Sequence, residues 1–199
     1  MSATTKTPLA DAQRTADHIA AALAPYCDRI AVAGSIRRQR PQVGDIELVC
    51  LPQRQTDLLG IVVPGLMPLE AFLQEKGVVI LKGGHDPKKK AIQKYLQFKY
   101  GRYSVDLFMP ESQSHWGSIL TLRTGSHDFN MWLMTRRASA VGVKFVNGLL
   151  YTWQRALIPT PEEEDVFEAL QMEFVPPNKR DDGGWLEYVR ETAVSEEGS

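Results

Sequence analysis

The sequence has little cysteine and no long apolar run. Cys27 and Cys50 are too few for a disulfide framework and lack metal-ligand spacing, which indicates a reducing compartment. No apolar run reaches the roughly 18 residues that a membrane-spanning helix needs. No charged-then-apolar leader begins the chain, and the four histidines have no spacing suited to zinc. We therefore expect a cytoplasmic protein, monomeric and without a membrane partner.

Two carboxylates share one face of a predicted strand. Residues 45–50 have strand character, and the alternation of side chains places Asp45 and Glu47 on the same surface. A third acid, Asp106, lies in the apolar run 105–108. Grouped ionised carboxylates repel one another and are costly to bury unless cations neutralise them. We therefore expect two Mg²⁺ ions, with Mn²⁺ as the alternative, at Asp45, Glu47 and Asp106.

A glycine-serine turn comes shortly before these acids. The β-like run 30–33 stops at Gly34, where the missing Cβ lets backbone N–H groups approach an anion. Ser35 adds a hydroxyl donor, and Arg38 adds a charged fork suited to triphosphate oxygens. Together with the acids that follow Gly44, this pattern predicts a site for nucleotide transfer.

These motifs resemble the DNA polymerase X family, within the polymerase-beta-like nucleotidyltransferase superfamily, over about residues 8–180. In that family a Gly-Ser-x-Arg-Arg segment and a Gly-Asp-x-Asp segment form the palm, and a Thr-Gly-Ser-x-x-Phe-Asn segment opens the thumb. Residues 34–38, 44–47 and 124–130 match those segments here. The stretch 162–180 is similar to the end of the thumb, and the layout resembles the minimal palm-thumb members.

The expected fold is α+β. We expect a palm over residues 1–110, with a mixed β-sheet flanked by helices, then a small α+β thumb over 111–180 and a loose tail over 181–199. The alternative for residues 185–189 is that they dock as one or two further helical turns. Expected helices lie within 8–26, at 116–122, at 129–141 and after Pro161. Expected strands lie near 30–34, 45–51, 78–81, 91–100 and 103–108, and Asn147 with Gly148 predicts a thumb hairpin.

The resemblance implies a DNA polymerase that adds dNMP from a dNTP to a primer 3′-hydroxyl by a two-metal mechanism, filling short gaps in DNA repair. Its partners would be primer-template or gapped DNA and a dNTP. Asp45 and Glu47 would each ligate both metals, and Asp106 the catalytic one. The implied nucleotide-binding residues are Gly34, Ser35, Arg38, Gly44 and Asn130, the last from the minor-groove edge.

Charge is unevenly placed along the chain. Residues 1–108 hold 15 Lys/Arg and 10 Asp/Glu, whereas residues 109–199 hold 8 and 14. The densest basic stretch contains Lys88, Lys89 and Lys90 and leads toward Asp106, so we expect these lysines to contact the DNA backbone. Arg136 and Arg137 are further candidates for contact with DNA.

Three departures from the family pattern leave a second function open. Glu47 stands where the family usually has Asp, and Leu122-Arg123 stands where cellular members often have Tyr-Phe. Met134 stands where some members place an Arg against the template, with Arg136 and Arg137 as candidates to compensate for it. These residues favour a template-independent nucleotidyltransferase acting on nucleic-acid ends or a small molecule. A non-catalytic DNA-binding module is a third reading, and the intact carboxylates weigh against it.

Overall fold

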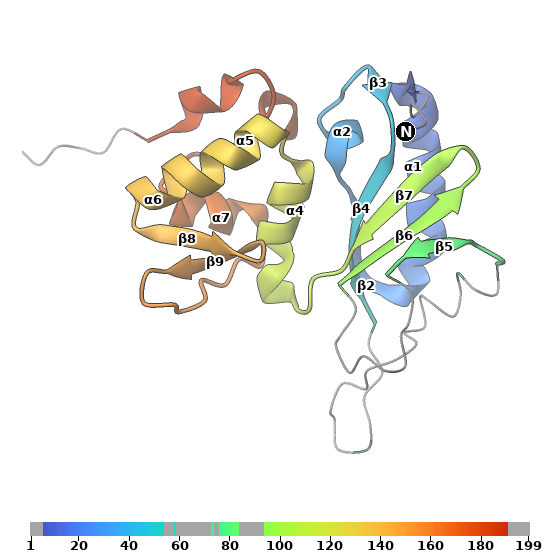
Figure 1. The fold of residues 1–199 in the computed structure, drawn as a ribbon, viewed down its shortest axis with the longest axis horizontal. Helices are drawn as coiled ribbons and strands as arrows, with labels where there is room; N and C mark the ends of the chain where they lie inside the picture. The colour runs from blue at the N-terminus through green and yellow to red at the C-terminus, as the bar shows by residue number, and fades with distance from the viewer. Residues whose placement is uncertain (1–5, 54–57, 59–72, 74–75, 84–93, 191–199) are drawn as a thin grey trace, which may run out of the picture.

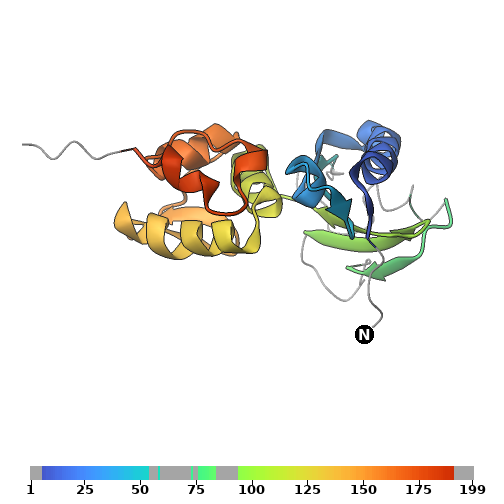
Figure 2. The same cartoon turned by 90° about the horizontal axis from the view of Figure 1, so that it is seen from above.

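The computed structural model describes residues 6–53, 58, 73, 76–83 and 94–190 (Figure 1). An N-terminal lobe, the palm, consists of a β-sheet with helix α1 (Leu9–Leu23) on one face. A C-terminal lobe, the thumb, consists of helices and a hairpin, and α4 (Trp116–Thr124) stands between the two lobes (Figures 1 and 2). The fold is therefore α+β, as the sequence predicts.

The palm sheet has five strands in the order β2-β4-β7-β6-β5. These strands are β2 (Cys27–Val32), β4 (Ile46–Pro52), β7 (Tyr103–Phe108), β6 (Tyr95–Tyr100) and β5 (Ile80–Lys82). β4 and β7 run parallel, while the other neighbours are antiparallel, so the sheet is mixed. Short strands β1 (Thr7–Pro8) and β3 (Gln42–Val43) form a separate pair.

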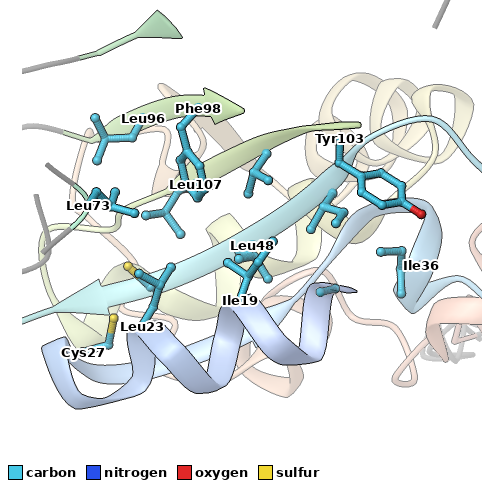
Figure 3. Close-up of a cluster of buried hydrophobic side chains, with 14 of the residues drawn as sticks. Ile19, Leu23, Cys27, Ile36, Leu48, Leu73, Leu96, Phe98, Tyr103 and Leu107 are labelled. Atoms are coloured by element: carbon cyan, nitrogen blue, oxygen red, sulfur yellow. The ribbon is translucent and has the colours of Figure 1, made fainter. Parts of the chain in front are cut away.

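One face of this sheet forms the palm core (Figure 3). The buried stripe of α1, which includes Ile19 and Leu23, packs against Leu48, Leu96 and Leu107 of the three central strands. The helix stops at Leu23, and the 3₁₀ turn η1 (Ala24–Tyr26), with its proline, leads into β2. Because side chains alternate along a strand, the residues between these core positions must project from the opposite face.

The thumb follows a 3₁₀ turn, η2 (Gln113–His115). Its elements are α4, α5 (His127–Met131), the π-helix η3 (Trp132–Arg137), α6 (Ala138–Ala140), the hairpin β8 (Val143–Val146) and β9 (Leu149–Thr152), α7 (Glu163–Ala169), η4 (Pro177–Lys179) and η5 (Gly184–Tyr188). In place of the single α-helix predicted over 129–141, α5, the π-helix η3 and α6 follow one another without a break. The predicted hairpin is present.

The segment 181–190 differs from the loose tail that we expected. Trp185 is only 6% exposed and belongs to the thumb core, where its ring lies 5.6 Å from that of Phe129. An isolated bridge between Met172 and Val189 fixes the end of this segment. Burying a large aromatic ring outweighs the polar composition around it. Residues 191–199 lie outside the described part of the chain.

A small apolar cluster joins the lobes. Ala33 and Val49 of the palm pack against Trp116 and Leu120 of α4. Val49 lies on the sheet face opposite α1, so this face of the palm turns toward the thumb. Among the residues that the structure describes, no helix combines the length and apolarity needed to cross a membrane.

Candidate active site

The structure brings the predicted acids to the sheet face that turns toward the thumb. Glu47 on β4 and Asp106 on β7 are register partners on adjacent parallel strands, and Asp45 lies directly before β4. Burial and the charges of Asp45 and Asp106 raise the pKa of Glu47 to about 7. Desolvation and the charge of Asp106 also raise the pKa of Asp45. The three carboxylates therefore form one electrostatic cluster.

The cluster fits hard divalent cations by its donor chemistry. It offers carboxylate oxygens, the ligands that Mg²⁺ and Mn²⁺ prefer, and its acids repel one another as long as no added cation neutralises them. In the described part of the chain, no three His, Cys, Asp or Glu side chains are already gathered as a metal cage.

Gly34 lies against Glu47. It has a positive φ of 61° and begins the short helix α2 (Gly34–Arg37), and a Cβ at this position would overlap the Glu47 carboxylate. The Ala33 N–H donates to the Glu47 carbonyl at 2.8 Å, which ties the turn to β4. The positive φ strains any residue that carries a Cβ, and such a Cβ would also displace the Glu47 carboxylate, so the turn favours glycine. Ser35 follows Gly34 within α2, and Gly44 directly precedes Asp45 in the chain.

Arg38 reaches from the palm to the thumb. Its Nη1 donates to the Thr124 carbonyl at 2.7 Å, and its Nε donates to Asp181 at 3.2 Å. Burial and the neighbouring acids raise the pKa values of Asp45 and Glu47, and the charge of Arg38 offsets a small part of each rise, so this guanidinium also lies near the carboxylates. Groups of the thumb therefore hold Arg38, the residue predicted to bind the triphosphate, beside the acids.

Asn130 has a structural task in this conformation. Its Nδ2 donates to the carbonyls of Leu122 at 2.7 Å and Gly125 at 3.4 Å, bridging the turn between α4 and α5. A Cβ at Gly125 would overlap the Asn130 side chain. The buried Asn130 Oδ1 accepts no hydrogen bond from the described residues.

The candidate DNA-contacting residues differ in their exposure and in their hydrogen bonds. Arg136 is exposed, whereas Arg137 donates to the carbonyls of Leu170 at 2.7 Å and Gln171 at 2.6 Å. Arg137 therefore braces the end of α7, a role that the sequence did not indicate. Lys88, Lys89 and Lys90 lie outside the described residues.

Sequence reasoning missed two residues that contact Asp106. Tyr95 Oη donates to Asp106 Oδ1 at 2.5 Å, and Gln97 Nε2 donates to the same oxygen at 2.8 Å. Burial, followed by the hydrogen bond to Asp106, raises the pKa of Tyr95 to about 12, so the phenol stays protonated at neutral pH. A signal was available: Tyr100 pairs with Tyr103 across a two-residue turn, a register that puts Gln97 opposite Asp106.

A pocket of about 510 Å³ opens beside Asp106. Its walls include Tyr95, Gln97, Phe108 and Arg123 together with Asn147 from the thumb hairpin. The Arg123 guanidinium lies 3.8 Å from the centre of the Phe108 ring, and its charge lowers the pKa of Glu47 against the influence of the acids. A ligand in this pocket would meet the third carboxylate, an aromatic ring and a cation.

A buried ion-pair cluster also joins the lobes. Glu163 of α7 is 4% exposed and accepts from Arg180 at 2.7 Å and from Arg37 of the palm at 2.5 Å. Burial opposes the ionisation of Glu163, but the two arginines outweigh it and hold its pKa below the usual value. Arg37, which lies within the segment 34–38 that resembles the Gly-Ser-x-Arg-Arg motif, therefore anchors the thumb.

The fold and this face of the sheet define a palm-thumb arrangement of the nucleotidyltransferase type. Residues 119–181 match the DNA polymerase beta thumb family, which supports a polymerase X thumb and implies DNA binding. Asp45, Glu47 and Asp106 lie outside the matched residues. No curated protein matches the chain.

Proposed function

We propose that the protein is a DNA polymerase that transfers dNMP from a dNTP to a primer 3′-hydroxyl, filling short gaps. One observation carries the proposal: Glu47 and Asp106 are register partners beside Gly34, on the sheet face that turns toward a polymerase-beta-type thumb. Carboxylates placed together in this way serve phosphoryl transfer when divalent cations neutralise them.

Asp45, Glu47 and Asp106 would hold the two cations, Mg²⁺ or Mn²⁺. Bound there, the ions would favour deprotonation of the 3′-hydroxyl and neutralise charge on the departing pyrophosphate. Arg38 supplies a positive charge next to the acids, on the side where Ser35 and Gly44 would meet the triphosphate. The thumb match supports DNA as the partner.

A template-independent nucleotidyltransferase is the second candidate. The observation that favours it is Met134, which is 37% exposed where some members of the family place an Arg against the template. Without that Arg the surface has one cation fewer for a template strand, and the exposed Arg136 is the candidate that would compensate for it.

Primer extension separates these functions. The assay compares matched and mismatched templates, single-stranded DNA, and dNTPs with NTPs, each with Mg²⁺ and with Mn²⁺. Extension that needs a template and prefers matched dNTPs supports the polymerase. Extension of single strands supports the second candidate. No extension by a protein that still binds DNA would exclude both transfers to nucleic acid and leave a non-catalytic module or transfer to a small molecule.

A further inference from the structure

Asp106 belongs to a layer of side chains on the sheet face that turns toward the thumb. Tyr95 and Gln97 alternate with the core residues Leu96 and Phe98 along β6, so both project from the same face as Asp106. Gln97 is the direct register partner of Asp106, and Tyr95 lies two residue pairs further along the strands, opposite Phe108. Two neutral donors therefore flank one carboxylate.

Both hydrogen bonds end on the same oxygen. A carboxylate has two oxygens and about four lone-pair sites. The Tyr95 phenol and the Gln97 amide both donate to Oδ1, at 2.5 Å and 2.8 Å. Two donors in different directions fix the plane of the carboxylate, and neither bond uses Oδ2.

Packing fixes the phenol in turn. The rings of Tyr95 and Phe108 lie 5.2 Å apart, and Arg123 covers the Phe108 ring at 3.8 Å. A phenol held by its ring has few other positions for its hydroxyl, so the bond to Asp106 costs little additional ordering.

We infer that Tyr95 and Gln97 are positioning residues that orient Asp106 for the metal-dependent step. The inference rests on the proposed function. Residues that hydrogen-bond to a metal ligand orient it, and their loss typically costs about 10- to 100-fold in metal affinity or activity. Neither residue needs to touch the substrate to have this effect.

The test compares Tyr95→Phe with a matched control, Tyr103→Phe. Both changes remove one phenol oxygen from the same hairpin, but the Tyr103 hydroxyl is bonded to Thr7 at 2.9 Å, on the α1 side of the sheet. For each variant, Mn²⁺ binding is measured without nucleotide from the spin-resonance signal of the free ion. Single-turnover extension gives the maximum rate and the dNTP dissociation constant.

Tyr95→Phe should weaken Mn²⁺ binding about tenfold and lower the maximum rate about 10- to 100-fold, with the dNTP dissociation constant changed less than about threefold. Tyr103→Phe should change neither the Mn²⁺ affinity nor the rate by more than about twofold. Gln97→Leu should repeat the Tyr95→Phe effect in smaller measure, and it decides the matter alone if Tyr95→Phe does not fold.

A double-mutant cycle distinguishes a positioning role of Tyr95 from a merely structural one. In an Asp106→Asn background, Tyr95→Phe should cause no further loss of Mn²⁺ binding, because the residue acts through that carboxylate. The inference is overturned by an equal loss in both backgrounds, by stronger Mn²⁺ binding in Tyr95→Phe, or by a phenotype matching Tyr103→Phe. If the wild type extends no primer, the proposed function fails, while the Mn²⁺ comparison still decides the role of Tyr95.

Discussion

Replacing Glu163 with Gln should destabilise the protein by about 3 kcal/mol, the lower end of the range for breaking a buried ion pair. Arg180 is completely buried, and the substitution removes the charge that its Nη1 contacts at 2.7 Å. Its Nε bond to the Val175 carbonyl at 2.9 Å would remain. The ring of Phe167 lies 5.1 Å from the guanidinium and offsets part of the loss, which is why we expect the lower end.

The neighbouring residue provides a control. Glu162 pairs with Arg29, but its side chain is 50% exposed, so Glu162→Gln should cost no more than about 1 kcal/mol. Both variants are compared with the wild type by urea unfolding at neutral pH, provided that the slope with denaturant is unchanged. A double variant, Glu163→Gln with Arg180→Met, should recover part of the loss because no fully buried charge is left unpaired.

Two results would refute this reasoning. In the first, the free energy of unfolding of Glu163→Gln lies within about 1 kcal/mol of the wild-type value. The buried charge of Arg180 would then not need Glu163 to compensate it. If the double variant is less stable than Glu163→Gln, then Arg180 stabilises the fold through its other contacts. In that case the ion pair is not the main reason for its burial.

Three further predictions concern the acids and the lysines. Asp45→Ala should abolish primer extension, and residual activity within about tenfold of the wild type would contradict its assignment as a ligand of both metals. The pKa of Glu47 is about 7 in the folded chain against 4.5 ordinarily, so metal-free stability should fall as pH rises from about 4.5 to 7; Glu47→Gln should flatten this part of a plot of Tm against pH. Replacing Lys88, Lys89 and Lys90 with Ala should reduce the salt dependence of DNA binding by about 0.9 in log–log slope per lost contact, and an unchanged slope would mean that they make none.

Local patterns predicted the frame of the site. Alternation predicted that Asp45 and Glu47 share a surface; Glu47 lies on β4, and Asp45 lies in the bend directly before that strand, near enough to raise the pKa of Glu47. The apolar run around Asp106 is a strand as expected. The glycine at position 34 was identified from its place between a strand and the acids, and the overlap that a Cβ would cause with Glu47 explains the requirement. These features depend on the period of a strand and on backbone conformation, both of which a short stretch of sequence encodes.

The partners of the arginines could not be predicted from the local sequence. Arg137 binds carbonyls more than thirty residues further along the chain, and Arg37 pairs with Glu163 of the other lobe. A guanidinium suits a phosphate, a carboxylate and a peptide carbonyl alike, so its partner depends on which distant groups the fold brings near. The apolar residues within 185–189 indicated that this segment can dock, but that Trp185 enters the thumb core depends on residues far away in the chain.

The position of Arg38 has a thermodynamic consequence. Because the Thr124 carbonyl and Asp181 hold this guanidinium beside the palm acids, undocking the thumb removes the restraints on a proposed nucleotide ligand. Coupling between two equilibria is reciprocal. If docking of the thumb raises the affinity for a nucleotide by some factor, binding of that nucleotide must raise the equilibrium constant for docking by the same factor. The strength of nucleotide binding and the closeness of the two lobes are then two measures of one coupling free energy.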